Sequence, residues 1–436
     1  MSDLFQVQQL NRRAMLQLCG MGIGSLGLTS LLQQEGLAAT PNPLAARQPH
    51  FKTKAKSVIW LFINGGPSHV DTFDYKPELI QRNDEQVPES LIDGVHFAMI
   101  KTDQTPLLRG SPFRFQRHGE HGAYVSELLP HLATVVDELA IIKSLRSDVF
   151  NHDPAVSLLN CGDPRVGRPT MGAWLSYGLG KETEELPAYV VLTSGKKRQP
   201  LLDSYWTNGF LPSEHQGCKL RAGRDAVLYL RNPDGVSRED RRRMLDLVTH
   251  LNEEEFDQSL DPEVRARVAQ YEMAYRMQTS IPELLDLSEE TQATQHLYGV
   301  GSKDDQLHLY GTQCLRARRL VEAGVSCVEV VSNGWDTHRD NFTRSRRLTS
   351  QIDQPFARLV SDLHDRGLLE KTLVIWMGEF GRTPRINGNT GRDHYPRAWT
   401  MALAGGGIKG GQVLGQTDAS GARVTSRPVT VADLFC

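Results

Sequence analysis

The sequence lacks the features that mark several classes of protein. Its six cysteines form no CxxC pair, so neither a cysteine-ligated zinc site nor a disulfide framework is expected. Lys and Arg number 49 against 52 Asp and Glu, and this balance leaves no positive field to hold nucleic acid or an anionic membrane surface. Beyond the N-terminus no stretch approaches 18 apolar residues, so we expect no stable membrane insertion.

The N-terminus has the pattern of an export signal. Arg12 and Arg13 precede a moderately apolar run rich in glycine, which ends in small residues. This order is typical of a secretory signal, and the paired arginines indicate the twin-arginine branch. We therefore predict a signal peptide over residues 1–46, the twin-arginine translocase as a partner during export, and a periplasmic or extracellular location. The alternative is a membrane anchor over residues 14–32, which are enough to span a bilayer.

The rest of the chain alternates between short apolar runs and amphipathic segments. Runs of β-branched and apolar residues predict strands at 57–63, 139–143, 188–193, 325–331, 372–377 and 400–404. Helical patterns lie at 124–137, 306–323 and 342–366. Continuous apolar strands joined by helices indicate an α/β domain over residues 50–436, with a largely parallel sheet covered on both faces. The charged segment 237–302 is predicted to be a helical insertion.

Polar segments follow the predicted strands. They are residues 64–74, 151–154, 333–338 and 378–384, and a fifth segment, 388–396, lies in a loop just downstream. In a parallel α/β sheet, ligands bind at the carboxyl ends of the strands. We therefore expect these segments to meet at one edge of the sheet and to build a site there.

Several side chains in these segments are metal-ligand types. Asp336 and His338 are two residues apart and point the same way in an extended segment, and a carboxylate with an imidazole suits Zn, Mn or Fe. His394 is a natural third donor. Glu379 ends a buried strand, where a carboxylate needs a metal or an ion-pair partner such as Arg382. A structural alternative for the first pair is a helix-capping Asp beside a surface His.

Two further segments offer ligands or catalytic groups. The first loop carries His69, Asp71 and Asp74 behind a pair of glycines that let the backbone approach a ligand. Its alternative is a tight turn with a capping Asp. His152 begins a predicted helix whose free N–H groups could face an anion. We expect His152 either to bind metal or to donate a proton to a leaving oxygen, although a single His in a loop often does neither.

Five motifs together resemble one bacterial family. They are GGPSHVDTFD (65–74), WDTH (335–338), GEFGRTP (378–384), GNTGRDHYP (388–396) and AGGGIKGG (404–411). The chain resembles the family catalogued as domain of unknown function 1501, within the alkaline phosphatase and sulfatase superfamily, over residues 50–435. The resemblance implies a three-layer αβα sandwich with a two-metal site at the strand ends. It also implies that the family sequence continues beyond Cys436.

The resemblance implies a division of the metal ligands. Asp336, His338 and His394 match, by order and strand context, the places that hold one metal. Asp71 and Glu379 are the candidates for a second metal. We expect one or two divalent ions, zinc first, with manganese, calcium or iron as alternatives.

The resemblance leaves the nucleophile open. Phe380 stands where the superfamily usually has His, and no unambiguous Thr nucleophile is present. Ser68, Ser147 or a metal-bound water would attack, and Arg382 or Arg392 would stabilise transition-state charge. The expected function is an exported metal-dependent hydrolase of phosphate or sulfate esters, acting on a small-molecule or glycan ester. The alternative is a non-catalytic metal- or glycan-binding envelope protein on the same fold.

Overall fold

The computed structural model describes most of the chain after the N-terminal segment. The described residues are 53–88, 107–180, 182–183, 185–194, 203–221 and 232–435. The predicted signal peptide at 1–46 lies outside them. Among the described residues, no helix combines the length and the apolarity needed to cross a bilayer.

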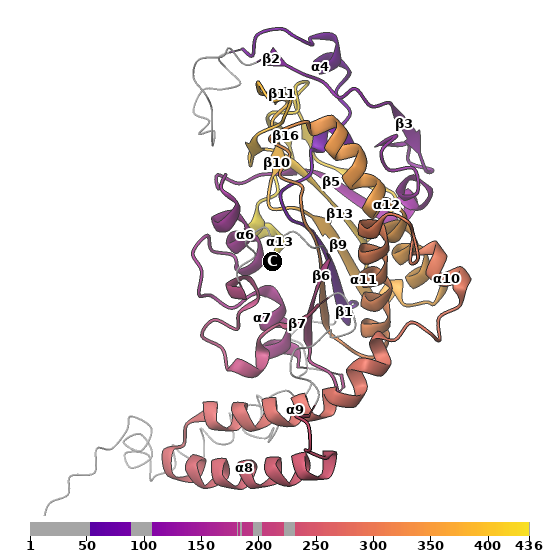
Figure 1. Cartoon of the computed structure of the whole chain (residues 1–436). Helices are drawn as coiled ribbons and strands as arrows, with labels where there is room; N and C mark the ends of the chain where they lie inside the picture. The colour runs from indigo at the N-terminus through magenta and orange to yellow at the C-terminus, as the bar shows by residue number, and fades with distance from the viewer. Residues whose placement is uncertain are drawn as a thin grey trace, which may run out of the picture. The chain divides into compact units, whose positions relative to one another are not determined.

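The core is an eight-stranded sheet in the order β14-β5-β13-β9-β1-β8-β6-β7 (Figure 1). Its strands are β1 (Ser57–Ile63), β5 (Leu139–Leu145), β6 (Tyr189–Ser194), β7 (Cys218–Leu220), β8 (Cys327–Ser332), β9 (Thr372–Met377), β13 (Trp399–Gly405) and β14 (Gln412–Leu414). All neighbouring strands pair in parallel except β13, which is antiparallel to β5 and β9. The predicted mostly parallel α/β sheet is confirmed.

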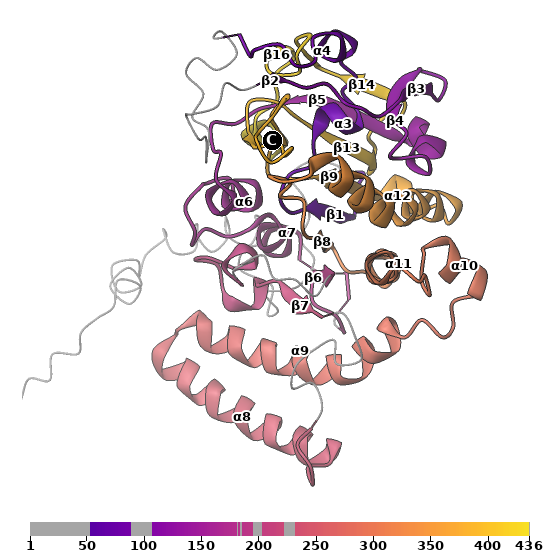
Figure 2. The same cartoon turned by 45° about the horizontal axis from the view of Figure 1, so that its top comes forward.

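Helices cover both faces of this sheet (Figures 1 and 2). The long helices α11 (Asp305–Glu322) and α12 (Asn341–Asp365) lie on one face. On the other face lie α6 (His152–Cys161), α7 (Met171–Leu179) and α13 (Val431–Leu434). The result is the three-layer αβα arrangement.

The alternation of side chains along β1 explains why both faces are covered. Ile59, Leu61 and Ile63 belong to the apolar cluster that includes the buried faces of α11 and α12. Trp60 and Phe62 point to the opposite face, where they join residues of α6. Successive strand residues point to opposite sides, so a strand that is apolar throughout must be buried on both.

One predicted element is wrong. Residues 124–137 have a helical pattern, but the structure divides them into β4 (Ala123–Ser126) and a 3₁₀ helix, η1 (Leu132–Glu138). β4 pairs with β3 (Phe115–His118), so pairing with a neighbour overrides the local pattern. Pro130 between the two pieces disfavours helical geometry at the residue before it, which prevents one continuous helix.

Short elements complete the edge of the sheet where the strands end. Three two-stranded ladders pair β10 (Gly381–Arg382) with β12 (His394–Tyr395), β11 (Arg385–Ile386) with β2 (Leu107–Leu108), and β15 (Gln416–Thr417) with β16 (Val424–Ser426). Two short helices, α3 (His69–Thr72) and α4 (Pro77–Gln81), follow β1. Because β10 and β12 are antiparallel, Arg382 lies opposite His394.

Residues 237–302 are helical. They contain α8 (Arg238–Ser259), α9 (Pro262–Leu285) and α10 (Gln292–Leu297). Ser237 and Asp240 form a reciprocal capping box that begins α8. The two long helices form a hairpin in which α9 lies between α8 and the sheet (Figure 2). Arg242 on α8 holds Glu272 on α9 with two hydrogen bonds.

Candidate metal centre

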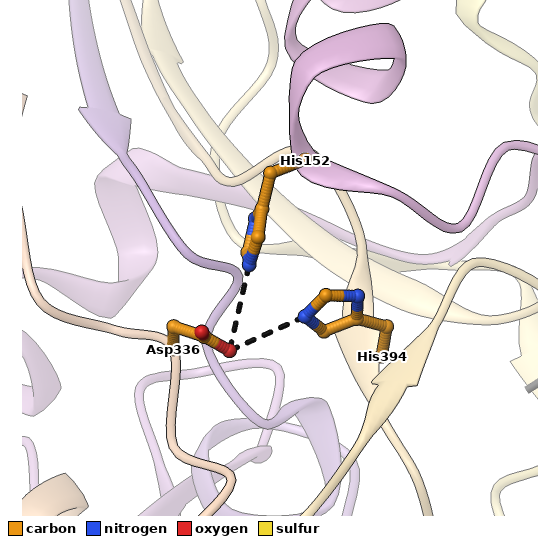
Figure 3. A group of neighbouring side chains, drawn as sticks. All are labelled: His152, Asp336 and His394. Carbon is orange, nitrogen blue, oxygen red and sulfur yellow. Dashed lines mark hydrogen bonds and ion pairs between the residues drawn. The ribbon is translucent and has the colours of Figure 1, made fainter. Parts of the chain in front are cut away.

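Four side chains from three loops meet at the carboxyl edge of the sheet. The Oδ1 atom of Asp336 lies 3.2 Å from Nε2 of His338, 3.2 Å from Nε2 of His394 and 3.4 Å from Nε2 of His152. The two Nε2 atoms of His338 and His394 are 2.9 Å apart. Figure 3 shows His152, Asp336 and His394 pointing toward one another from separate parts of the chain. Their ligand atoms all lie within 4.8 Å of each other.

The topology brings these residues together. His338 and Asp336 follow β8, and His152 begins α6, which follows β5. His394 belongs to β12 in the loop before β13. Since β1, β5, β8 and β9 run in the same direction, the segments after them emerge at one edge. The sequence predicted this convergence, and it had placed Asp336, His338 and His394 in one set.

The other nitrogen of each imidazole has a fixed acceptor. Nδ1 of His338 lies 2.8 Å from Asp393 Oδ1, and Nδ1 of His152 lies 2.6 Å from Glu379 Oε1. Nδ1 of His394 lies 2.7 Å from the carbonyl oxygen of Phe150, which only accepts hydrogen bonds. A neutral ring that donates through Nδ1 carries its lone pair on Nε2. When all three rings are neutral, three such lone pairs and a carboxylate oxygen face one another.

This arrangement fits a metal ion. Without a proton or a cation between them, converging lone pairs and a carboxylate oxygen repel each other. Metal-bound histidines typically donate their second ring N–H to a carboxylate or a carbonyl, as all three rings do here. Nε2 of His152 is buried and has no hydrogen bond within the described part of the chain. The donor set of three imidazoles and one carboxylate suits zinc and other first-row divalent ions.

Burial and neighbouring charges set the protonation of the centre. Burial lowers the pKa of His394 to about 4, so this ring is neutral near pH 7 and its lone pair is available. Burial also lowers the pKa of His152, but the neighbouring carboxylates of Asp336 and Glu379 outweigh it and raise the pKa to about 9. Burial raises the pKa of Asp336, yet the surrounding histidines and Arg382 hold it far below its usual range. A metal must therefore displace a proton from His152.

Three of the four side chains of the centre are partly exposed. The side chains of Asp336, His152 and His338 are 29%, 27% and 21% exposed, whereas that of His394 is 7% exposed. A catalytic metal site needs an open coordination position, and a structural one is closed. The partial exposure of three of the four groups shows that solvent reaches these side chains.

Arg382 is fully buried behind Asp336. Its Nη2 atom lies 2.9 Å from Asp336 Oδ1, and its other N–H groups donate to the carbonyl oxygens of Gly65, Gly66 and Arg392. Gly65 has a φ of +114°, and a Cβ at this position would lie 2.4 Å from the backbone nitrogen of Asp336. Glycine is therefore required where the first loop meets Asp336. The polar contacts of Arg382 are therefore with Asp336 and with backbone carbonyl oxygens.

Glu379 lies on the far side of His152 from Asp336. It is fully buried, and its carboxylate accepts a hydrogen bond from the Gly65 backbone N–H, 2.9 Å from Oε1, besides the contact with His152 Nδ1. The ring of Phe380 packs against both His152 and His394, with centroid distances of 5.1 Å and 4.6 Å, and these two imidazoles contact each other at 4.2 Å. An apolar ring therefore occupies the space next to these two imidazoles.

Asp71 and Arg392 form a separate buried pair. The Arg392 Nε atom lies 2.9 Å from Asp71 Oδ2, both side chains are fully buried, and Asn341 donates a second hydrogen bond to the same oxygen. The other N–H groups of Arg392 donate to the carbonyl oxygens of Thr383 and Arg109. The hydrogen bonds of both side chains are thus with each other, with the Asn341 side chain and with neighbouring backbone.

The two predicted serine nucleophiles differ in their contacts. Ser68 is the N-cap of α3; its hydroxyl is buried and has no hydrogen-bond partner in the described ranges. The Ser147 hydroxyl accepts a hydrogen bond from the Val149 backbone N–H at 3.1 Å, a local turn contact. The hydrogen bonds of the described residues join neither hydroxyl to a histidine of the metal centre.

Sequence reasoning missed Asp393. It lies 2.8 Å from His338 Nδ1, and the Asn387 side-chain amide and the Thr383 hydroxyl hold its carboxylate and its backbone N–H in place. The only signal was its position beside His394 in the segment RDHYP, where adjacent residues of an extended chain point to opposite sides. Asp393 and His394 consequently reach the centre from different directions.

The comparison with solved structures gives distant matches. A protein in the alkaline phosphatase superfamily from Vibrio parahaemolyticus matches with a TM-score of 0.38 and 9% identity, over 95% of this chain and 74% of that one. Alkaline phosphatase from the Antarctic bacterium TAB5 matches with a TM-score of 0.33 and 11% identity, over 85% and 96%. PsFucS1 sulfatase from Pseudoalteromonas sp. matches with a TM-score of 0.33 and 12% identity, over 91% of this chain and 68% of that one.

The family comparison covers nearly all of the described domain. No curated protein matches the sequence. The family described as "Protein of unknown function (DUF1501)" matches residues 55–436, a range that includes every residue of the metal centre and its orienting partners. The chain therefore belongs to the DUF1501 family.

Proposed function

We propose that this protein is an exported hydrolase of phosphate or sulfate esters that depends on a single divalent metal ion. The observation that carries the proposal is the convergence of three imidazole Nε2 atoms on one oxygen of Asp336, while each Nδ1 faces a fixed acceptor. The ligands would be His152, His338, His394 and Asp336. When bound there, the ion supplies a Lewis acid that polarises an ester oxygen and lowers the pKa of an attacking water.

The residues around the ligands support this chemistry by holding them in place. Glu379 and Asp393 keep the His152 and His338 rings oriented with Nε2 toward the site, and Arg382 fixes Asp336. Water is the proposed nucleophile because neither candidate serine hydroxyl is held by a histidine base. The partial exposure of Asp336 and His152 supports access of an ester from solvent.

One ion is proposed because the second set of donors is engaged elsewhere. The Asp71 carboxylate is held by Arg392 and Asn341, and the Glu379 carboxylate by His152 and the Gly65 N–H. A second ion would have to displace a buried guanidinium or an imidazole, and breaking such a buried pair costs about 3–5 kcal/mol.

The proposal includes the cell compartment and the substrate class. Arg12 and Arg13 ahead of the apolar N-terminal run support export by the twin-arginine translocase to the periplasm or beyond. The solved structures named above include a sulfatase and an alkaline phosphatase. From the chemistry of the site, the proposed substrate is a phosphate or sulfate ester of a small molecule or a glycan.

A metal assay combined with ester hydrolysis tests the proposal. Purified protein loaded with zinc or manganese should bind about one ion per chain and hydrolyse an aryl phosphate or an aryl sulfate. Asp336→Ala should abolish both properties, whereas Asp365→Ala, at an exposed carboxylate near the end of α12, should leave both unchanged. Absence of bound metal in the wild-type protein would refute the metal centre itself.

A second candidate function is a metal- or glycan-binding envelope protein without turnover. The turn contact of the Ser147 hydroxyl and the packing of Phe380 against His152 and His394 favour it, because both leave fewer groups for catalysis. Stoichiometric metal binding without hydrolysis of either ester would support this candidate and contradict the proposed hydrolase activity.

A further inference from the structure

One face of α8 carries an apolar stripe that is exposed in the described part of the chain. Met244, Leu247 and Leu251 are 55%, 59% and 55% exposed. Their spacing of three and then four residues puts them on one face of the helix. The face toward α9 is a different one, marked by the buried Leu245. Three large apolar side chains in a row on a helix surface are typical of a contact site and not of a solvated face.

Charge is distributed unevenly along the same helix. Residues 238–243 carry four arginines and two acidic residues, whereas residues 253–259 carry four acidic residues and no basic one. A helix dipole favours acidic residues near the N-terminus and basic residues near the C-terminus. Beyond Glu239 and Asp240 in its first turn, α8 has the opposite arrangement, so its charges do not follow the helix dipole.

These charges are placed symmetrically about the apolar stripe. Arg243 precedes Met244 by one residue, and Glu254 follows Leu251 by three. Arg243 and Glu254 are eleven residues apart, which is about three turns at 3.6 residues per turn, so they flank the stripe on the same side. The midpoint between them falls between residues 248 and 249, and the midpoint between Met244 and Leu251 falls between residues 247 and 248.

We propose that α8 is a self-association surface, and that two copies of this chain pair through antiparallel α8 helices about a two-fold axis near Leu247. In such a pair, Met244 of one copy meets Leu251 of the other, and Arg243 of one copy meets Glu254 of the other. A two-fold interface must be self-complementary, and a helix that is basic at one end and acidic at the other meets this condition only when antiparallel.

The exposure of the charged partners agrees with this role. The side chain of Arg243 is 76% exposed and reaches only Asp240, one turn away on its own helix. Glu254 is 61% exposed, with His250 at 3.5 Å. Both side chains are thus free to swing toward a second copy, and their helix α8 is separated from the sheet by α9 (Figure 2).

The size of the surface predicts a reversible dimer. A helix of 22 residues is about 33 Å long, and one pair of such helices buries less than the roughly 1,600 Å² of a standard interface. We therefore expect a monomer–dimer equilibrium that depends on protein concentration.

Sedimentation equilibrium of the purified chain over a concentration series tests the proposal. The wild-type mass should rise with concentration from 48.7 kDa toward twice that value. Leu247→Glu should weaken association at least tenfold, and Val413→Glu, the same change at a half-exposed position on β14, should leave it unchanged. A mass that stays at the monomer value at all concentrations overturns the proposal. A dimer whose association is unchanged by Leu247→Glu overturns it as well.

Charge reversal tests the pairing directly. Arg243→Glu and Glu254→Arg should each weaken the dimer about tenfold, since each places like charges together at two symmetric positions. The double variant should restore the wild-type association. If the double variant does not regain the wild-type association, the assigned pairs are wrong. This experiment remains informative even if Leu247→Glu fails to fold.

Cysteine cross-linking tests the direction of the helices. A mixture of Met244→Cys and Leu251→Cys proteins should form a disulfide-linked heterodimer under mild oxidation, faster than either protein alone. Faster linkage within each single variant would indicate parallel helices and overturn the antiparallel arrangement. The metal content of all these variants should equal that of the wild type.

Discussion

The metal centre and helix α8 are both rich in charged residues, but they use charge differently. At and next to the metal centre, the side chains of Glu379, Arg382 and Arg392 are buried, and each has fixed partners from distant segments. On α8, Arg243 and Glu254 lie in solvent and contact residues one turn away. Buried charge therefore positions the site, whereas exposed charge is available for another molecule.

The comparison predicts that single changes have unequal costs in the two regions. Removing one partner of a buried ion pair leaves the other charge without compensation in a low dielectric. Removing a partner at the surface lets water replace it. The following changes test this difference, from the largest expected effect to the smallest.

Asp71→Asn should produce the largest loss of stability. The change leaves the fully buried Arg392 guanidinium without its carboxylate, which costs about 3–5 kcal/mol. The free energy of unfolding from urea titration measures the effect. A loss below about 1 kcal/mol, typical of surface pairs, would contradict the distinction between the two regions.

Glu329 should make stability depend on pH. It is buried in β8, where burial raises its pKa to about 7 from 4.5, although the Tyr189 hydroxyl donates a hydrogen bond to it. Between these values the folded state holds a proton that the unfolded state has lost, so stability falls as pH rises from 4.5 through 7. The total loss is about 3 kcal/mol, because each pKa unit corresponds to about 1.4 kcal/mol.

Glu329→Gln should remove this dependence. The amide stays neutral, so the variant should lose less stability than the wild type between pH 5 and pH 8 in matched denaturant titrations. Parallel pH profiles for the two proteins would show that Glu329 ionises normally in the folded state.

Asp393→Ala should weaken metal binding about 10- to 100-fold, because the His338 ring loses the acceptor that fixes its orientation. Isothermal titration with zinc at constant pH measures the affinity, and Asp365→Ala is the matched carboxylate control. An unchanged affinity would exclude His338 as a ligand oriented by Asp393.

Arg242→Gln should have the smallest effect. Although Arg242 makes two hydrogen bonds to Glu272 between α8 and α9, the pair is partly exposed, so we expect a loss of less than about 1 kcal/mol. A loss as large as that of Asp71→Asn would mean that the hairpin is as tightly coupled to the core as the metal centre is.

The sequence predicted the sheet well because its strands are apolar on both faces. Runs such as residues 57–63 and 372–377 have no polar side to place in water, so local composition already decides their burial. The segment 124–137 was mispredicted because its pattern is compatible with two structures. Pairing with β3 and the proline at 130 decided between them, and neither effect appears in the periodicity.

For the site, the sequence determined where it lies and which residue types it holds. Strand ends of a parallel sheet converge, so Asp336, His338 and His394 could be grouped from their order along the chain. Only the tertiary structure decided what each carboxylate contacts: Asp71 faces Arg392, Glu379 faces His152, and Asp393 faces His338. These choices depend on contacts of about 3 Å between segments up to 321 residues apart, which backbone periodicity does not specify.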